Sequence, residues 1–116
     1  MTTATATTEV RDELVERIDE ADARVRNICD TSVLAHNDVN EYIRLSSKIL
    51  ALRKAKETIQ KRVQTDDETQ FNAALEDIFK AYRESTEAEH TPKTDGARGG
   101  YSLAIDYMRY SIGQLG

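Results

Sequence analysis

The chain has 116 residues, of which 39% are hydrophobic and 32% charged, and its formal net charge is −5. This length indicates a single domain, and the composition is that of a folded protein rather than a disordered one. No apolar run reaches the ~18 residues that a membrane-spanning helix needs, and the first residues lack the features of a secretory signal. Cys29 is the only cysteine, so no intrachain disulfide can form. We expect a soluble protein of the cytoplasm, or one carried within a particle.

The N-terminal part predicts a tail followed by a helix. We expect residues 1–8 to form a disordered tail, with Thr8 as the N-cap of a helix over about residues 9–30. Apolar side chains in this helix are spaced alternately four and three residues apart, which is the pattern of a heptad seam. The seam residues are Leu14, Ile18, Ala21, Val25 and Ile28.

Two further helices follow the same spacing. A helix over about residues 39–63, capped by Asn37 or Asp38, has a long seam and a second, shorter apolar stripe formed by Ile43 and Leu50. A helix with two apolar stripes usually packs on two sides, so we expect it to be the central element. The third helix, over about residues 65–89, begins at Thr65 or Asp66. The seam of the second helix is Tyr42, Leu45, Ile49, Leu52, Lys56, Ile59 and Val63, and that of the third is Phe71, Leu75, Ile78 and Tyr82.

The only proline and three of the five glycines fall in residues 90–101, HTPKTDGARGGY. Proline disfavours helix at the residue before it, and Asp-Gly and Gly-Gly are turn signals. We therefore predict a flexible loop over residues 91–100. Residues 101–116 then suit a short helix, although Tyr101 to Tyr107 also alternate as in a strand. The sequence thus predicts an all-α fold: a small antiparallel bundle with a three-helix unit over 9–90, the loop, and a short C-terminal helical segment.

Charge is unevenly distributed along the chain. Residues 39–64 carry seven basic and two acidic side chains, whereas the segments before and after them are strongly acidic. One interpretation is pairing inside a single bundle, where rim pairs contribute little energy but help to select neighbours. In the heptad frame, however, some charges lie opposite the seams and face either water or another molecule.

Catalytic and metal-binding patterns are weak. Glu87 and His90 form one Glu-x-x-His pair, whereas a four-helix di-iron site uses two such pairs and two further glutamates. Cys29 lies beside the first seam with no base nearby, which favours a buried apolar role. The Gly96–Gly100 segment is not followed by the Lys-Ser/Thr of a phosphate-binding loop. We therefore expect no enzyme activity, no metal and no cofactor.

The pattern favours a non-enzymatic interaction or structural subunit that self-associates or joins a larger assembly. It would bury apolar helix faces, and complementary charge would set its partner and orientation. We expect a docking strip on the last segment, which could reach an adjacent subunit across the loop, and a set of intersubunit ion pairs. The strip is Tyr101, Ile105, Met108 and Ile112, and the ion pairs would join Lys54 and Lys61 to Glu13, Glu16 and Glu20.

Two other functions stay open at this point. The first is a helical subunit that binds nucleic acid through the basic second helix, although the net negative charge opposes a polyanion. The second is a small acidic inhibitor that blocks a basic groove on a host protein. We expect no membrane partner and no small-molecule substrate. The candidate nucleic-acid contacts are Arg44, Lys48, Arg53, Lys54, Lys61, Arg62, Lys93 and Arg98.

Overall fold

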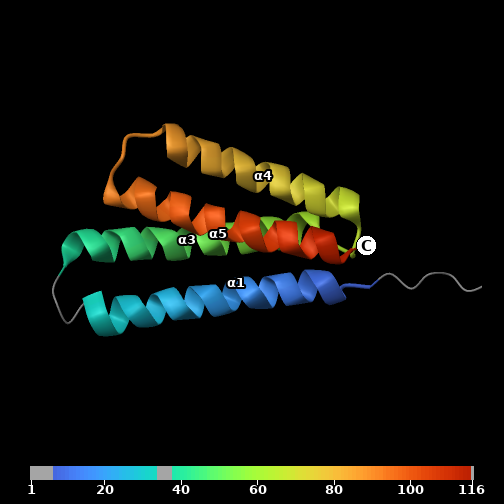
Figure 1. The fold of residues 1–116 in the computed structure, drawn as a ribbon, viewed down its shortest axis with the longest axis horizontal. Coiled ribbons are helices and arrows are strands. Elements are labelled where there is room, and N and C mark those ends of the chain that lie inside the picture. The colour runs from blue at the N-terminus through green and yellow to red at the C-terminus, as the bar shows by residue number, and fades with distance from the viewer. Residues whose placement is uncertain (1–6, 34–37, 116) are drawn as a thin grey trace, which may run out of the picture.

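The structure, a computed structural model, describes residues 7–33 and 38–115. In this part of the chain it consists of α1 (Glu9–Ile28), a short π-helical turn η1 (Cys29–Val33), α3 (Val39–Arg62), α4 (Glu68–Glu87) and α5 (Pro92–Gln114). The chain turns back after each long helix, so that consecutive helices lie side by side (Figure 1). The prediction of an all-helical fold is confirmed for the described residues. The predicted disordered tail falls largely on residues 1–6, which lie outside them.

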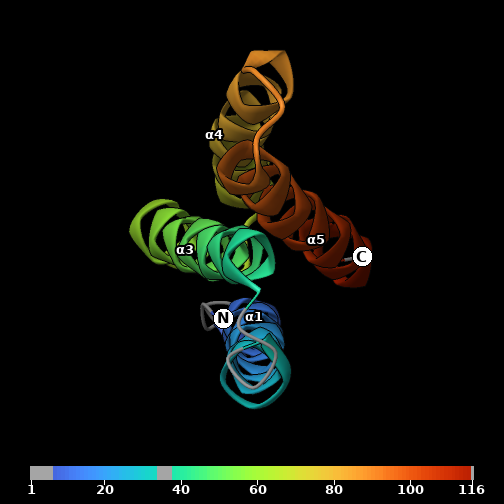
Figure 2. The ribbon, with the colours of Figure 1, turned by 90° about the vertical axis from the view of Figure 1, so that its left-hand side faces the viewer.

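Helices α3 and α5 form the middle of the molecule, with α1 on one side and α4 on the other (Figure 2). The contact between α3 and α5 is the most extensive between any two elements. The predicted seams of the first three helices face this centre. Two predicted seam residues at helix ends, Ile28 and Tyr42, are about half exposed instead. The buried residues of α1, α3 and α4 include Leu14, Ile18, Ala21, Val25, Leu45, Ile49, Leu52, Ile59, Phe71, Ala74 and Ile78.

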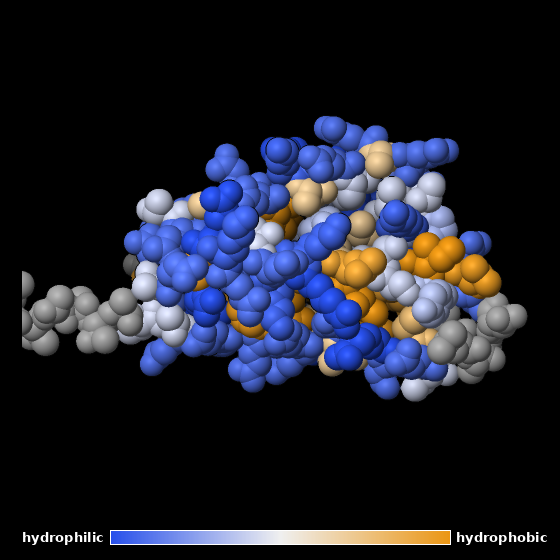
Figure 3. Space-filling view, turned by 180° about the vertical axis from the view of Figure 1, so that it is seen from behind, coloured by the Kyte–Doolittle hydropathy of each residue, from blue (hydrophilic) through white to orange (hydrophobic). Residues whose placement is uncertain are grey.

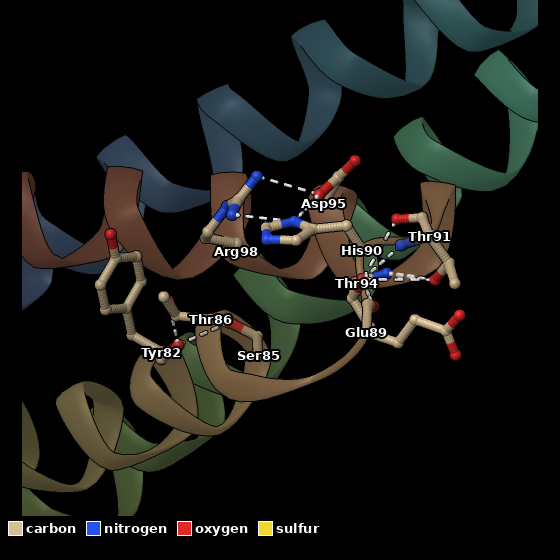
Figure 4. Close-up of polar contacts among 9 residues, drawn as sticks. All are labelled: Tyr82, Ser85, Thr86, Glu89, His90, Thr91, Thr94, Asp95 and Arg98. Carbon is tan, nitrogen blue, oxygen red and sulfur yellow. Dashed lines mark hydrogen bonds and ion pairs between the residues drawn. The ribbon is translucent and has the colours of Figure 1, made fainter.

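The predicted flexible loop over residues 91–100 is wrong, because these residues are the cap and the first turns of α5. Thr91 is the N-cap and Pro92 the first helical residue, where a missing N–H and a fixed φ favour the helix. The hydroxyl of Thr91 accepts a hydrogen bond from the backbone N–H of Thr94 (3.2 Å), and the Thr94 hydroxyl accepts one from the Thr91 N–H (2.9 Å). Figure 4 shows this reciprocal cap at the start of α5. The fourth helix is therefore long, not short, and with its N-cap it includes the residues predicted to form the loop.

The glycines of this segment serve close packing between two helices. Gly96 and Gly100 are buried on one face of α5, four residues apart, and face Ser47 and Ala51 of α3. A Cβ atom at position 96 would lie 2.0 Å from the backbone oxygen of Arg44, and one at position 100 would lie 2.7 Å from the Ala51 Cβ. The two backbones are so close that only hydrogen atoms fit between them. Glycine costs helix stability, but here it permits the main contact of the fold.

We predict that Gly100→Ala lowers the free energy of unfolding by about 1–3 kcal/mol, the usual effect of overpacking a filled core. The added methyl group would lie 2.6 Å from the Lys48 backbone oxygen. The adjacent Gly99 is a matched control, because a Cβ there meets only the Lys48 side chain at 4.0 Å. Gly99→Ala should raise stability by about 0.5–1 kcal/mol through the better helix propensity of alanine. Urea unfolding followed by circular dichroism tests both variants, and equal effects at the two positions would contradict the packing argument.

The start of α1 is capped by a residue distant in sequence. Thr8, the residue before the helix, makes no side-chain cap. Instead Asp66 accepts hydrogen bonds from the backbone N–H groups of Val10 (2.9 Å) and Arg11 (3.0 Å) and from the hydroxyl of Thr7 (3.0 Å). Partial burial alone would raise the pKa of Asp66, but these hydrogen bonds outweigh it, and its pKa is lowered.

This contact corrects two predicted boundaries. Because Asp66 bonds to α1, the cap of α4 is Asp67, which accepts a hydrogen bond from the Gln70 backbone N–H at 3.2 Å. Thr7 also accepts a hydrogen bond from the backbone N–H of Asp66 (2.7 Å), so it is held against the body of the protein and is not part of a free tail. The cap predicted for α3 is confirmed at Asp38, which accepts from the Glu41 N–H at 3.1 Å.

We predict that Asp66→Asn lowers the free energy of unfolding at pH 7 by about 1 kcal/mol, as losing a helix cap does. The amide nitrogen cannot accept the second backbone hydrogen bond. Because the folded-state pKa of Asp66 is depressed, its contribution is complete above the ordinary aspartate pKa of about 3.9. It is lost as the pH falls through that value and then through the lower folded-state pKa.

The difference in the free energy of unfolding between wild type and Asp66→Asn should therefore become smaller at low pH. Denaturant titrations at pH 7 and at low pH would measure it. Asp106→Asn is the control, since Asp106 is exposed and makes no hydrogen bond within the described residues. Equal losses in the two variants at pH 7 would show that Asp66 contributes charge alone.

Candidate interaction surface on helix α3

One face of α3 exposes apolar side chains to solvent. Val39, Ile43 and Leu50 are 64%, 38% and 56% exposed, and their spacing of four and seven residues places them on one side of the helix. Ser46 lies between them on the same side, and we call these four residues the outer row. In Figure 3, apolar side chains gather near the start of α3, while polar side chains cover most of the rest of the face shown. The second apolar stripe predicted for this helix, Ile43 and Leu50, is therefore not covered by any helix among residues 7–33 and 38–115.

Grooves lie on both sides of Leu50. One, with a volume of about 320 Å³, runs between the end of α1 and the first half of α3, and the buried side chains of Cys29 and Ile49 line it. Charged side chains at its edge come from Arg26, Asp30 and Arg53. A smaller groove of about 90 Å³ lies between α3 and α5 and is lined by residues that include Leu50, Lys54, Lys93 and Tyr101. Leu50 thus forms a ridge between two hollows, a shape that a complementary helix can fill.

Three of the seven basic residues of α3 pair with the acidic helices beside it, namely Arg53, Lys56 and Arg62. With two further pairs inside single helices, at Arg44 in α3 and Arg98 in α5, four of the eight candidate nucleic-acid contacts are held by carboxylates. The hydrogen bond from Arg44 to Glu41 also lowers the pKa of the Glu41 carboxyl. The pairs are Arg53–Asp22 (3.0 Å), Lys56–Asp19 (2.7 Å), Arg62–Asp77 (2.8 Å), Arg98–Asp95 (2.9 Å) and Arg44–Glu41.

The other candidates are lysines without an ion pair in the described part of the chain. Lys54 and Lys61 line a groove of about 630 Å³ that also contains Glu57 and Tyr101. Lys54 shares the smaller groove with Lys93. Burial raises the pKa of the Tyr101 hydroxyl, and the charge of a nearby glutamate adds to that shift. The unpaired charge of α3 therefore concentrates in its second half, beyond the apolar part of the outer row.

The predicted docking strip on the last segment is not an exposed surface. Tyr101, Ile105 and Met108 are buried in the chain's own core, and Ile112 is partly buried against it. The reason is that α5 begins at Pro92 and packs against α3, α4 and α1. These side chains are apolar because they fill the core, which corrects the expectation that they dock onto an adjacent subunit.

The residues predicted to form intersubunit ion pairs form no such pair with one another within one copy of the described chain. Glu13 pairs with Arg17 of the same helix at 2.7 Å. Glu16 and Glu20 are exposed and form no ion pair among residues 7–33 and 38–115. The structure does not bring these glutamates to Lys54 or Lys61 in one copy.

The chemistry-bearing residues do not converge. In the described residues, no three His, Cys, Asp or Glu side chains are placed to hold one metal ion. His90 contacts Asp95 at 3.2 Å, and Asp95 also pairs with Arg98, so that the three side chains cluster at the start of α5 (Figure 4).

Within the described part of the chain, no helix combines the length and the apolar character needed to cross a bilayer.

No family model, curated protein or solved structure matches this chain. The interaction surface on α3 is therefore inferred from the exposure, spacing and grooves of its residues alone. Sequence reasoning identified Ile43 and Leu50, but it missed Val39, assigned Tyr42 to the core, and did not foresee the groove at Cys29. The signal that would have found Val39 is its spacing of four residues from Ile43.

Proposed function

We propose that the protein is a non-enzymatic interaction or structural subunit that joins another protein through the outer row of α3. The single observation that carries this proposal is the exposed line of the large apolar residues Val39, Ile43 and Leu50 on one side of α3. The scaffold would be a small antiparallel bundle, consistent with the chain reversals seen in Figure 1. Cys29 is the only cysteine and is buried, which is compatible with a reducing location in the cytoplasm or within a particle.

The energetics favour covering this surface. Burying apolar surface yields about 25 cal/mol per Å², and large apolar residues that cluster on one face of a folded protein mark interaction sites more often than scattered ones do. The charged residues at the rim add little affinity when exposed, but they restrict the orientation of a partner. The central leucine and the two grooves would therefore supply affinity, and the lysines and aspartates around them would supply selectivity.

We predict that Leu50→Asp removes the protein from its complex. In extracts of the cells that naturally make it, the wild-type chain should migrate as a species larger than its own 13.1 kDa, whereas the variant should migrate as a monomer. The reason is that a carboxylate at the centre of an apolar contact cannot be desolvated without a partner. Size-exclusion chromatography with immunodetection measures the shift.

Tyr110→Asp is the matched control for this experiment. Tyr110 is also a large, half-exposed side chain, but it lies on α5 against Arg17, away from the outer row. The proposal requires that Tyr110→Asp keeps the large species. A wild-type chain that migrates as a monomer, or equal losses for the two variants, would overturn it.

A second function, binding to nucleic acid, is favoured by one observation. Lys48, Lys54, Lys61 and Lys93 form no ion pair in the described residues, and all but Lys48 line grooves that Tyr101 also lines. Lysines of this kind can neutralise phosphates. Against it stand Glu57 in the same groove and the net charge of −5, which repels a polyanion.

If nucleic acid is the partner, affinity for RNA or DNA should fall steeply between about 50 and 200 mM salt. The double substitution Lys54→Glu and Lys61→Glu should abolish that binding. Lys80→Glu with Arg83→Glu makes the same change in charge on the exposed side of α4 and should have a smaller effect. Fluorescence anisotropy with labelled oligonucleotides measures each constant, and an absence of salt-dependent binding would exclude this function.

A further inference from the structure

We infer that the occupant of the outer row is a second copy of this chain, with the two α3 helices antiparallel about a twofold axis near Ser46. This inference rests on the proposed function and adds the identity of the partner. Ile43 of each copy would face Leu50 of the other, and Val39 would face Lys54. The contact would cover the apolar half of each α3 and leave the other helices of the bundle in place.

The spacing along α3 supports a self-pairing seam. Continuing the outer row by steps of four and three leads from Leu50 to Arg53 and Glu57, which is the repeat of two helices that pack along their length. Only the first half of this seam is apolar. An antiparallel overlap centred between Ile43 and Leu50 therefore buries each apolar half against the other and exposes no additional apolar residue.

The crossing point is suited to close approach. Ser46 is the small residue of the outer row, and it is partly exposed at the edge of the 320 Å³ groove, whereas Ser47 is buried against α5. Small side chains at the crossing let the two helices approach closely. Leu50 of each copy would then project beside the partner's groove, whose apolar lining is Cys29 and Ile49.

Charge complementarity distinguishes a second copy from other occupants. The start of α3 is acidic, with Asp38 as its N-cap and Glu41 in its first turn, and Asp30 lies at the edge of the 320 Å³ groove. The second half of α3 carries Lys54 and Lys61 without an ion pair in the described residues. In the antiparallel arrangement each basic end lies beside the acidic end of the other copy, and the opposed helix dipoles agree with this.

Other arrangements and partners fit less well. A parallel pair would place Lys54 and Lys61 against the same lysines of the second copy, which is repulsive. A nucleic acid would meet an apolar centre flanked by Asp30 and Asp38. A surface with the same apolar half and the same two charged ends, placed antiparallel, matches every part of the row at once, which is the property of an isologous twofold contact.

The first test is the oligomeric state of the purified chain. Sedimentation velocity over a concentration series should show a dimer for the wild type and for Tyr110→Asp. Leu50→Asp should raise the dimer dissociation constant at least about tenfold, as loss of a central contact does. Circular dichroism should show equal helix content in the three proteins, so that unfolding is not mistaken for dissociation.

The second test is the register. Ile43→Cys and Leu50→Cys are each placed in a Cys29→Ala background, mixed under reducing conditions and then oxidised. The antiparallel pair predicts that the disulfide between position 43 of one chain and position 50 of the other dominates over the 43–43 and 50–50 products. Mass spectrometry identifies the products, and a dominance of the like-with-like disulfides would overturn the inference by indicating a parallel pair.

The two levels of the proposal fail differently. A purified chain that stays monomeric, together with a large complex in cell extracts that Leu50→Asp abolishes, would overturn the second copy and retain the proposed function with a different partner. A monomer both when purified and in extracts would overturn both. A dimer that Leu50→Asp leaves intact would place self-association on another face and reject the α3 contact.

Discussion

The close contact between the backbones of α3 and α5 is the constraint on which the rest of the structure depends. With Gly96 and Gly100 facing Ser47 and Ala51, the two helices form a central pair, and α1 and α4 each pack against it from one side. The large residues of α5, such as Met108, can then reach the core. This arrangement also decides which face of α3 stays uncovered, because α5 lies against the small residues and not against the outer row.

The heptad seams made most of the first three helices predictable, since apolar spacing reports helical periodicity directly. The last helix was not predictable in the same way. Proline and glycine usually interrupt helices, but Pro92 lies at the first helical position and Gly96 and Gly100 lie on one face. Their meaning depends on the helix opposite, which no local pattern reveals. The cap of α1 by Asp66 was missed for the same reason, because its donors are more than fifty residues away in the chain.

The candidate surface was predictable in part. The second stripe at Ile43 and Leu50 was visible from spacing alone, but spacing shows that a face is apolar and not whether the chain covers it. The last segment, which contains Tyr101 and Met108, was equally apolar, but its apolar side chains are buried in the core of the chain itself. Charge was more informative: acidic helices on either side of a basic one do pair with it, as in Arg53–Asp22 and Arg62–Asp77. Lys54 and Lys61, which form no ion pair among the described residues, mark a charged face in the second half of α3 that the bundle itself leaves exposed.

The continuity of α5 across its glycine-rich start has a consequence for the kinetics of assembly. A segment on a flexible hinge could leave one copy and insert into another, so that subunits would exchange elements slowly. Here the last 23 helical residues form one rod anchored along the core, and exchange would require that rod to detach. A partner of α3, as proposed above, would instead meet a surface that is already folded, so association should proceed at the rates of rigid docking, about 10⁵–10⁷ M⁻¹s⁻¹, without an ordering step beforehand.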